Sequence, residues 1–160
     1  MGKRDFIQFR VGYFDKGIAA AGTVVGLLCV AVLMAWFHFF EPDLANTFPP
    51  VSSAALHWVI LTGVLFAFIN ATLEEAIFRE LVLQTLRQRL SDNSANFIQA
   101  LLFGFAHIGV QSVPHGWSGF ILTATFGLLL GAVRIIFEGL GAAIWIHIIA
   151  DLGVYFLLLQ

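Results

Sequence analysis

Residues 70–80 read NATLEEAIFRE, and this run places charged side chains inside a long apolar stretch, residues 58–86. A charge at the centre of a membrane helix costs at least about 2.5 kcal/mol, so it must be paired or face a cavity. Residues four apart share a helix face, and Glu75 and Arg79 can therefore form an ion pair within the helix. Glu74 lies about 100° further round the helix, on a stripe with Asn70. Because Arg79 is committed to Glu75, Glu74 is the candidate general base.

The composition of the whole chain indicates a lipid environment. Hydrophobic residues make up 59% of the 160 residues and charged residues 11%, whereas soluble domains contain about 25% charged residues. The mean hydropathy is +0.90. The basic residues are dispersed and the net charge is -2, so we expect no nucleic-acid partner. With the single cysteine, Cys29, an intramolecular disulfide is excluded.

Five apolar stretches predict an all-α integral membrane protein, a compact bundle of about five transmembrane helices. They cover residues 17–40, 58–86, 95–108, 119–137 and 140–159, and a span needs about 20 residues. All eight Lys and Arg residues fall on one side of this topology. By the positive-inside rule the N-terminus is cytoplasmic. The segment 41–56 contains three prolines and no Lys or Arg, and is expected on the other side. We predict one membrane domain over residues 1–160.

Two further apolar stretches carry pairs of residues one helical turn apart. The pairs are Phe103 and His107 in FGFAH, and His147 and Asp151 in HIIAD. At 1.5 Å per residue, Glu74 and His107 lie roughly 20 Å from the polar ends of their helices, and His147 and Asp151 roughly 13 to 20 Å from theirs. We therefore predict one shared polar cavity. Two imidazoles with several carboxylates can activate water or bind a metal, and a proton or ion relay is also open.

Three short motifs thus occur in order on separate apolar stretches: Glu-Glu-x-x-x-Arg at residues 74–79, Phe-x-x-x-His at residues 103–107 and His-x-x-x-Asp at residues 147–151. Together they resemble the CPBP intramembrane proteases, the Abi or CAAX-protease family, which is related to the type II CAAX prenyl endopeptidases. The resemblance covers about residues 61–158. It predicts a CPBP-like catalytic core at residues 58–159 and leaves the N-terminal span, residues 17–40, outside the motif core.

The resemblance implies an intramembrane endopeptidase of the glutamate type, acting on a membrane-associated or lipidated polypeptide. Glu74, assisted by His107, would activate water, and His147 with residue 151 would stabilise the oxyanion. Family members often carry Asn at that last position, whereas an ionised Asp151 only accepts hydrogen bonds. Asp151 is therefore expected either to orient His147 or to stay protonated. The implied catalytic set is Glu74, Glu75, Arg79, His107, His147 and Asp151.

The sequence leaves both the cofactor and the class of protein open. No His-Glu-x-x-His stretch is present, and we expect catalysis without a cofactor. A zinc-dependent version of the protease would use Glu74, His107 and His147 as ligands, with water at the open position. The same residues would also suit a non-catalytic immunity or scaffold protein, or a proton or ion relay. The expected location is a prokaryotic cytoplasmic (inner) membrane, with the bilayer and a membrane-associated polypeptide as partners.

Overall fold

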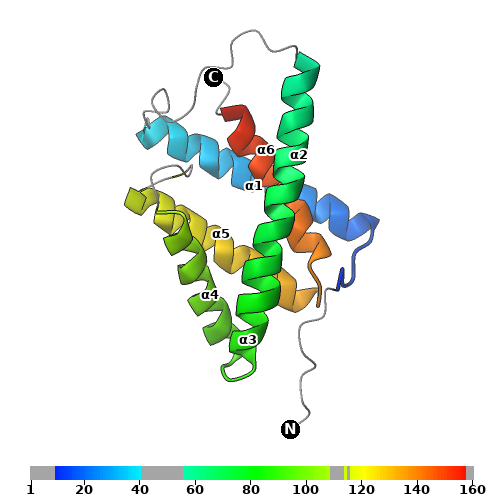
Figure 1. The fold of residues 1–160 in the computed structure, drawn as a ribbon, viewed down its shortest axis with the longest axis vertical. Coiled ribbons are helices and arrows are strands. Elements are labelled where there is room, and N and C mark those ends of the chain that lie inside the picture. Colours follow the sequence, from blue (N-terminus) through cyan, green and yellow to red (C-terminus); the bar gives the residue numbers. More distant parts are fainter. Residues whose placement is uncertain (1–9, 41–55, 109–113, 115, 158–160) are drawn as a thin grey trace.

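A computed structural model describes residues 10–40, 56–108, 114 and 116–157 (Figure 1). Over these residues the chain is helical and contains no strand. The helices, with the π-helical segment η1, are α1 (Lys16–Phe40), α2 (Leu56–Glu75), η1 (Ala76–Val82), α3 (Leu83–Arg87), α4 (Asp92–Ala106), α5 (Gly116–Ile136) and α6 (Gly141–Leu157). Because α2, η1 and α3 follow without a break, the described chain forms five continuous helices. The predicted all-helical bundle is confirmed.

Three of the helices are long and apolar enough to cross a membrane: α1, the continuous helix His57–Arg87 and α5. The apolar helix α6 has 17 residues and α4 has 15, about 26 and 22 Å at 1.5 Å per residue. Both are shorter than the ~30 Å hydrocarbon core. The integral membrane assignment therefore rests on three long helices. Residues 158–159, predicted to complete the last span, and 41–55, in the predicted outer loop, lie outside the described residues.

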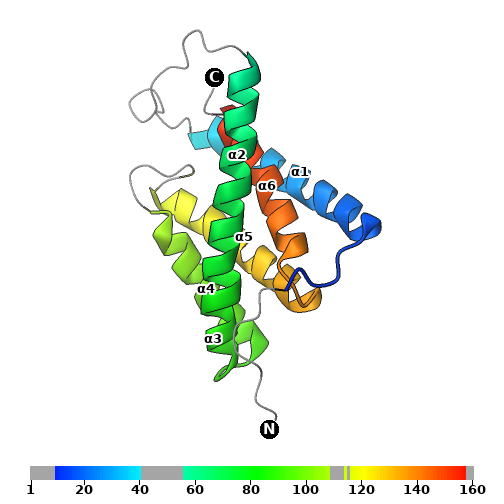
Figure 2. The same cartoon turned by 45° about the vertical axis from the view of Figure 1, so that its right-hand side comes forward.

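The long helix formed by α2, η1 and α3 runs through the middle of the bundle. α6 packs against both α1 and α2, while α4 packs against α5, and η1 contacts α4 and α5. In Figure 2 α4 lies on one side of the long helix and α6 on the other, while α5 and α1 cross behind the long helix. Segments carrying the three predicted motifs consequently face one another across the centre of the bundle.

Glycines allow the helices to approach closely at two of these contacts. A Cβ on Gly26 of α1 would lie 2.8 Å from Cβ of Ile149 on α6. A Cβ on Gly131 of α5 would overlap the side-chain oxygen of Asn96 on α4. Small residues at helix interfaces serve close packing in membranes, and both of these pack helices within the bundle.

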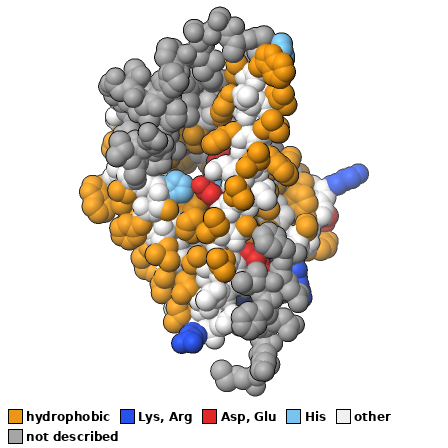
Figure 3. All heavy atoms as spheres, viewed as in Figure 1, with side chains coloured by type: hydrophobic (Ala, Val, Ile, Leu, Met, Phe, Trp, Pro, Cys, Tyr) orange, Lys and Arg blue, Asp and Glu red, His pale blue; other side chains and the backbone are white. Residues whose placement is uncertain are grey.

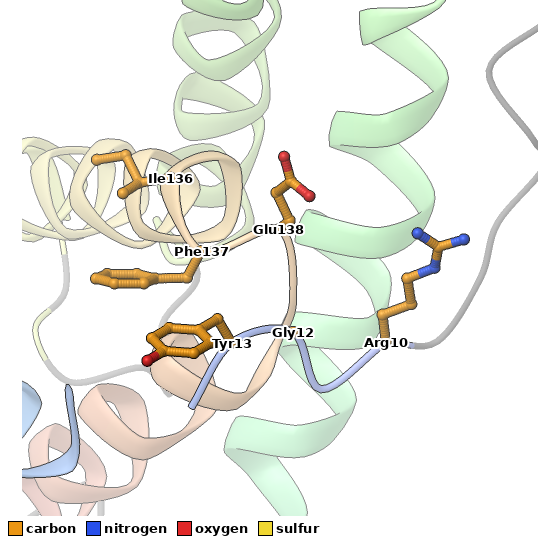
Figure 4. Close-up of a pocket in the computed structure, with 6 residues that line it drawn as sticks. All are labelled: Arg10, Gly12, Tyr13, Ile136, Phe137 and Glu138. Carbon is orange, nitrogen blue, oxygen red and sulfur yellow. The ribbon is translucent and has the colours of Figure 1, made fainter. Parts of the chain in front are cut away.

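The segment before α1 lies against the turn between α5 and α6. The backbone carbonyls of Arg10 and Val11 accept hydrogen bonds from Leu140 and Gly141, at 2.8 and 2.9 Å. These bonds satisfy N–H groups at the start of α6, which have no partner inside their own helix. Figure 4 shows the residues that line a hollow beside this contact, among them Arg10 and Glu138. The residues that line the hollow include none of the three predicted motifs.

Candidate active site

The structure brings the six predicted site residues together between α2, η1, α4 and α6. Nε2 of His107 lies 3.7 Å from Oε1 of Glu74. Nε2 of His147 lies 3.5 Å from Oε2 of the same carboxylate. The same nitrogen of His147 also lies 3.5 Å from Oδ1 of Asp151. Glu74 thus faces both imidazoles. The residues that were predicted to lie at one depth on three helices form one cluster.

Glu75 and Arg79 form the sealed side of this cluster. Their side chains are fully buried, and Nη1 of Arg79 lies 3.1 Å from Oε1 of Glu75. The same carboxylate oxygen lies 2.8 Å from Nδ1 of His147. The predicted intrahelical ion pair therefore exists, and Glu75 also holds the ring of His147.

The phenylalanine of the second motif packs at the centre of the cluster. This residue is Phe103, and the Arg79 guanidinium lies over its ring at 4.4 Å from the centroid. That separation is within the distance for a cation–π attraction. The ring centroids of Phe103 and His107 are 4.5 Å apart, and His147 approaches the Phe103 ring edge-on at 6.2 Å. Phe126 of α5 packs edge-on against His147 at 5.2 Å. The aromatic rings thus cover the sealed side and contact both imidazoles.

Hydrogen bonds to the Nδ1 atoms determine what each histidine offers the cluster. Nδ1 of His107 lies 2.8 Å from the carbonyl oxygen of Phe103, which can only accept, so Nδ1 carries the proton. Nε2 of a neutral His107 is then a lone pair directed at Glu74. In His147, Nδ1–H is donated to Glu75. Its Nε2 donates to an anion when the ring is doubly protonated.

Exposure divides the cluster into an open and a closed half. The side chains of Glu74 and His107 are 21% and 20% exposed, whereas His147 is 4% exposed and Asp151 11%. Figure 3 shows a histidine and an acidic side chain adjacent at the surface near the middle of the molecule, among hydrophobic side chains. Glu74 and His107 are therefore the members of the cluster that are accessible from outside the bundle.

Glu74 also carries an unsatisfied buried oxygen. Its Oε2 has no hydrogen-bond partner among the described residues, and Oε2 of Glu75 is in the same position. Buried polar atoms are nearly always hydrogen-bonded, and exceptions are associated with strain, catalysis or a bound small molecule. The carboxylate of Glu74 consequently has acceptor capacity available for a reactant.

Two polar contacts between helices beside the cluster are not predicted by the sequence patterns. Nδ2 of Asn70 donates to Oδ2 of Asp151 at 3.1 Å. Arg134 of α5 donates through Nη2 to Oε2 of Glu80 at 2.8 Å, and this pair is buried. Residue 70 carries a detectable signal, because it lies one turn before Glu74 on the same helix face. The partner of Glu80 lies 54 residues away and has no local signal.

The π-helical turn of η1 is the other feature that the sequence does not reveal. It begins directly after Glu75 and contains both Arg79 and Glu80, which are 0% and 1% exposed. Its hydrogen bonds span five residues, and such turns occur frequently at functional sites. Within this turn, Arg79 pairs with Glu75 on the same helix, whereas its neighbour Glu80 pairs with Arg134 on α5.

The side-chain arrangement bears on whether the cluster could hold a metal. Among residues 10–40, 56–108, 114 and 116–157, no group of three His, Cys, Asp or Glu side chains is placed to hold a metal ion. The candidate zinc set of Glu74, His107 and His147 converges without meeting that requirement.

Membrane-spanning helices with carboxylates and imidazoles buried between them define a polytopic membrane protein with an internal ionisable site. Residues 56–153 match the family model described as Type II CAAX prenyl endopeptidase Rce1-like. The match covers more than half of the chain, so the chain belongs to this family, as the motifs predict. It is thereby a membrane peptidase of the CAAX type, a class that acts on membrane-associated prenylated proteins. No curated protein and no solved structure matched the chain.

Proposed function

We propose that the chain is a glutamate-type intramembrane endopeptidase that hydrolyses a peptide bond with water and its own side chains. The observation that carries this proposal is the asymmetry of the cluster. Glu74 and His107 are about one-fifth exposed, beside a fully buried Glu75–Arg79 pair. An accessible carboxylate and imidazole held by a rigid inner layer are what general-base catalysis requires.

In the first step, a water molecule donates one hydrogen bond to Glu74 and the other to Nε2 of His107. Both groups are acceptors, since Nδ1 of His107 is bound to a carbonyl oxygen. As the water oxygen attacks the scissile carbonyl carbon, its proton passes to the Glu74 carboxylate. The product of this step is a tetrahedral intermediate with a negative oxygen.

In the second step, His147 stabilises the negative oxygen through Nε2–H. Glu75 accepts the Nδ1–H bond at 2.8 Å and favours the doubly protonated ring, while Arg79 compensates the charge of Glu75. Donors preorganised in a dry site stabilise an oxyanion far more than donors in water. The intermediate then collapses, the C–N bond breaks, and protonated Glu74 returns its proton to the leaving amine.

Asp151 is proposed to orient His147. Its Oδ2 accepts from Asn70 at 3.1 Å, and its Oδ1 faces Nε2 of His147 at 3.5 Å. Oδ2 thus has a hydrogen-bond donor, whereas Oδ1 faces the His147 ring beyond the usual hydrogen-bond distance and acts on its charge, which leaves Nε2–H for the oxyanion. This arrangement supports the orienting role over a direct donor role.

The proposed substrate is a polypeptide with a transmembrane or lipidated end, and the proposed location is a prokaryotic cytoplasmic membrane. Apolar side chains on the outer face of the long helix flank Glu74, and Leu73 and Ile77 are 58% and 49% exposed. Such a surface suits a substrate that arrives within the lipid phase. The accessibility of Glu74 and His107, which are 21% and 20% exposed, supports catalysis over an immunity or scaffold role, in which these residues would serve only structure.

The test compares membrane proteomes of cells carrying the wild-type chain or Glu74→Ala. We expect one or more uncleaved membrane precursors to accumulate in the mutant, with the mutant present at wild-type abundance. If a well-folded mutant accumulates no precursor under any growth condition, the proposed function is wrong. A proton relay instead predicts pH-dependent transport in proteoliposomes and no cleavage.

A further inference from the structure

We propose that Asn70 is a positioning residue of the site, holding the Asp151 carboxylate in the orientation that faces His147. This inference rests on the proposed function. Asn70 lies on α2 one turn before Glu74, and its side chain crosses to α6, where Nδ2 donates to Oδ2 of Asp151 at 3.1 Å. The bond fixes one carboxylate oxygen and leaves Oδ1 directed at Nε2 of His147, 3.5 Å away.

The charges around His147 explain why a neutral donor suits this position. Three carboxylates approach the ring: Glu75 at 2.8 Å, Glu74 at 3.5 Å and Asp151 at 3.5 Å. The Asp151 side chain is only 11% exposed, so water contributes little to holding it. An amide satisfies Oδ2 without adding a cation that would compete with His147 for the carboxylate.

The position of this bond couples it to the general base. Residues 70 and 74 lie on one face of α2, so the helix that carries Glu74 also anchors Asp151. Losing the Asn70 amide frees the carboxylate to rotate away from His147 while the backbone of both helices stays in place. The expected consequence is a slower chemical step in a folded protein.

The chain offers a matched control on the same two helices. Thr62 of α2 and Tyr155 of α6 share a hydrogen bond of 2.7 Å between their hydroxyl groups, two turns along α2 from Asn70. Tyr155→Phe removes this α2–α6 bond without touching the cluster. If Asn70 merely joined α2 to α6, both substitutions would act alike.

The experiment measures cleavage of a precursor that accumulates in the Glu74→Ala strain, using purified proteins in liposomes across a range of pH. We expect Asn70→Ala to lower kcat about tenfold with KM nearly unchanged and to displace the pH profile. Tyr155→Phe should match the wild type in kcat and in the pH profile. In an Asp151→Asn background, Asn70→Ala should cost less than about twofold further, because the carboxylate it orients is gone.

Three outcomes would overturn the inference. In the first, Asn70→Ala and Tyr155→Phe have equal effects on kcat. In the second, Asn70→Ala changes neither kcat nor the pH profile while cleavage still depends on Glu74, which removes the positioning role and leaves the proposed function intact. In the third, no wild-type cleavage depends on Glu74, and both proposals fall together. If Asn70→Ala folds poorly, Asn70→Ser retains a short donor and should recover part of the rate.

Discussion

Two ionisable groups of residues lie between the helices of this protein, and they are built in opposite ways. Glu80 and Arg134 form a closed pair: Nη2 of Arg134 lies 2.8 Å from Oε2 of Glu80, and the side chains are 2% and 7% exposed. The cluster around Glu74 is open, with separations of 3.5 and 3.7 Å to the two imidazoles.

The difference separates structural from reactive charge. A direct buried ion pair has little freedom to bind anything else, and breaking it is costly because one charge is left without compensation. Glu74 instead lies beyond the usual hydrogen-bond distance of either imidazole, with one oxygen unsatisfied. Charges of this second kind can accept protons from a reactant. The contrast predicts which substitutions abolish activity and which unfold the protein.

After loss of Glu74 itself, the largest effect on cleavage is expected for His107→Ala. Loss of a general acid–base partner typically lowers rates by 10² to 10⁴, and the precursor cleavage rate should fall by about that factor. Because the side chain is 20% exposed, stability should change little, as thermal unfolding in detergent would check. A variant with wild-type cleavage would remove His107 from the reactive group.

Arg134→Met should have the opposite effect to His107→Ala: it should lower stability and leave the cleavage rate of folded molecules unchanged. Burying Glu80 without its partner is expected to cost about 3 to 5 kcal/mol of unfolding free energy, measured by chemical denaturation in micelles. The double variant Glu80→Gln, Arg134→Met should recover most of the loss. Cleavage per folded molecule should match the wild type in both variants, and a rate loss at full folding would make the pair part of the chemistry.

Gly131→Ala is expected to act through packing and hydrogen bonding beside the closed pair. The added Cβ would overlap Asn96, whose side-chain oxygen accepts from Gln99 at 2.9 Å. Overpacking typically costs about 1 to 3 kcal/mol, so the melting temperature should fall. Gly116→Ala is unsuitable as the control, because that residue has φ +68°. Gly17→Ala is the better control, since its nearest contact is the exposed Asp15 side chain at 3.2 Å.

A strong chelator should have the smallest effect, leaving the cleavage rate of the purified protein unchanged. The reason is that the proposed reaction uses Glu74, His107 and water without a metal. Activity lost in chelator and restored by stoichiometric zinc would replace this mechanism with the zinc-dependent one.

Much of this contrast could be predicted from local patterns. Hydropathy predicts the helices, and the four-residue spacing predicts the Glu75–Arg79 pair, which the structure forms at 3.1 Å. Equal depth along separate spans predicts that Glu74 and the two histidines lie close together, and the structure places both imidazoles within 3.7 Å of the Glu74 carboxylate. These predictions succeed because each depends on helix geometry, which is regular.

The remaining features depend on rotation of one helix against another. The Glu80–Arg134 pair and the Asn70–Asp151 bond join residues 54 and 81 apart in the chain. The π-helical turn changes the direction in which the side chains of residues 76–82 point, and no residue type in this segment predicts the turn. A lone acidic residue such as Glu80 therefore gives no indication from sequence of whether it is structural or reactive.

The central claim is tested most directly by comparing Glu74→Gln with Glu80→Gln in the same liposomes, with cleavage and folded fraction measured together. The account predicts that Glu74→Gln folds like the wild type and does not cleave, whereas Glu80→Gln is less stable but its folded molecules cleave at the wild-type rate. Cleavage by Glu74→Gln at the wild-type rate, or its loss in fully folded Glu80→Gln, would contradict the account.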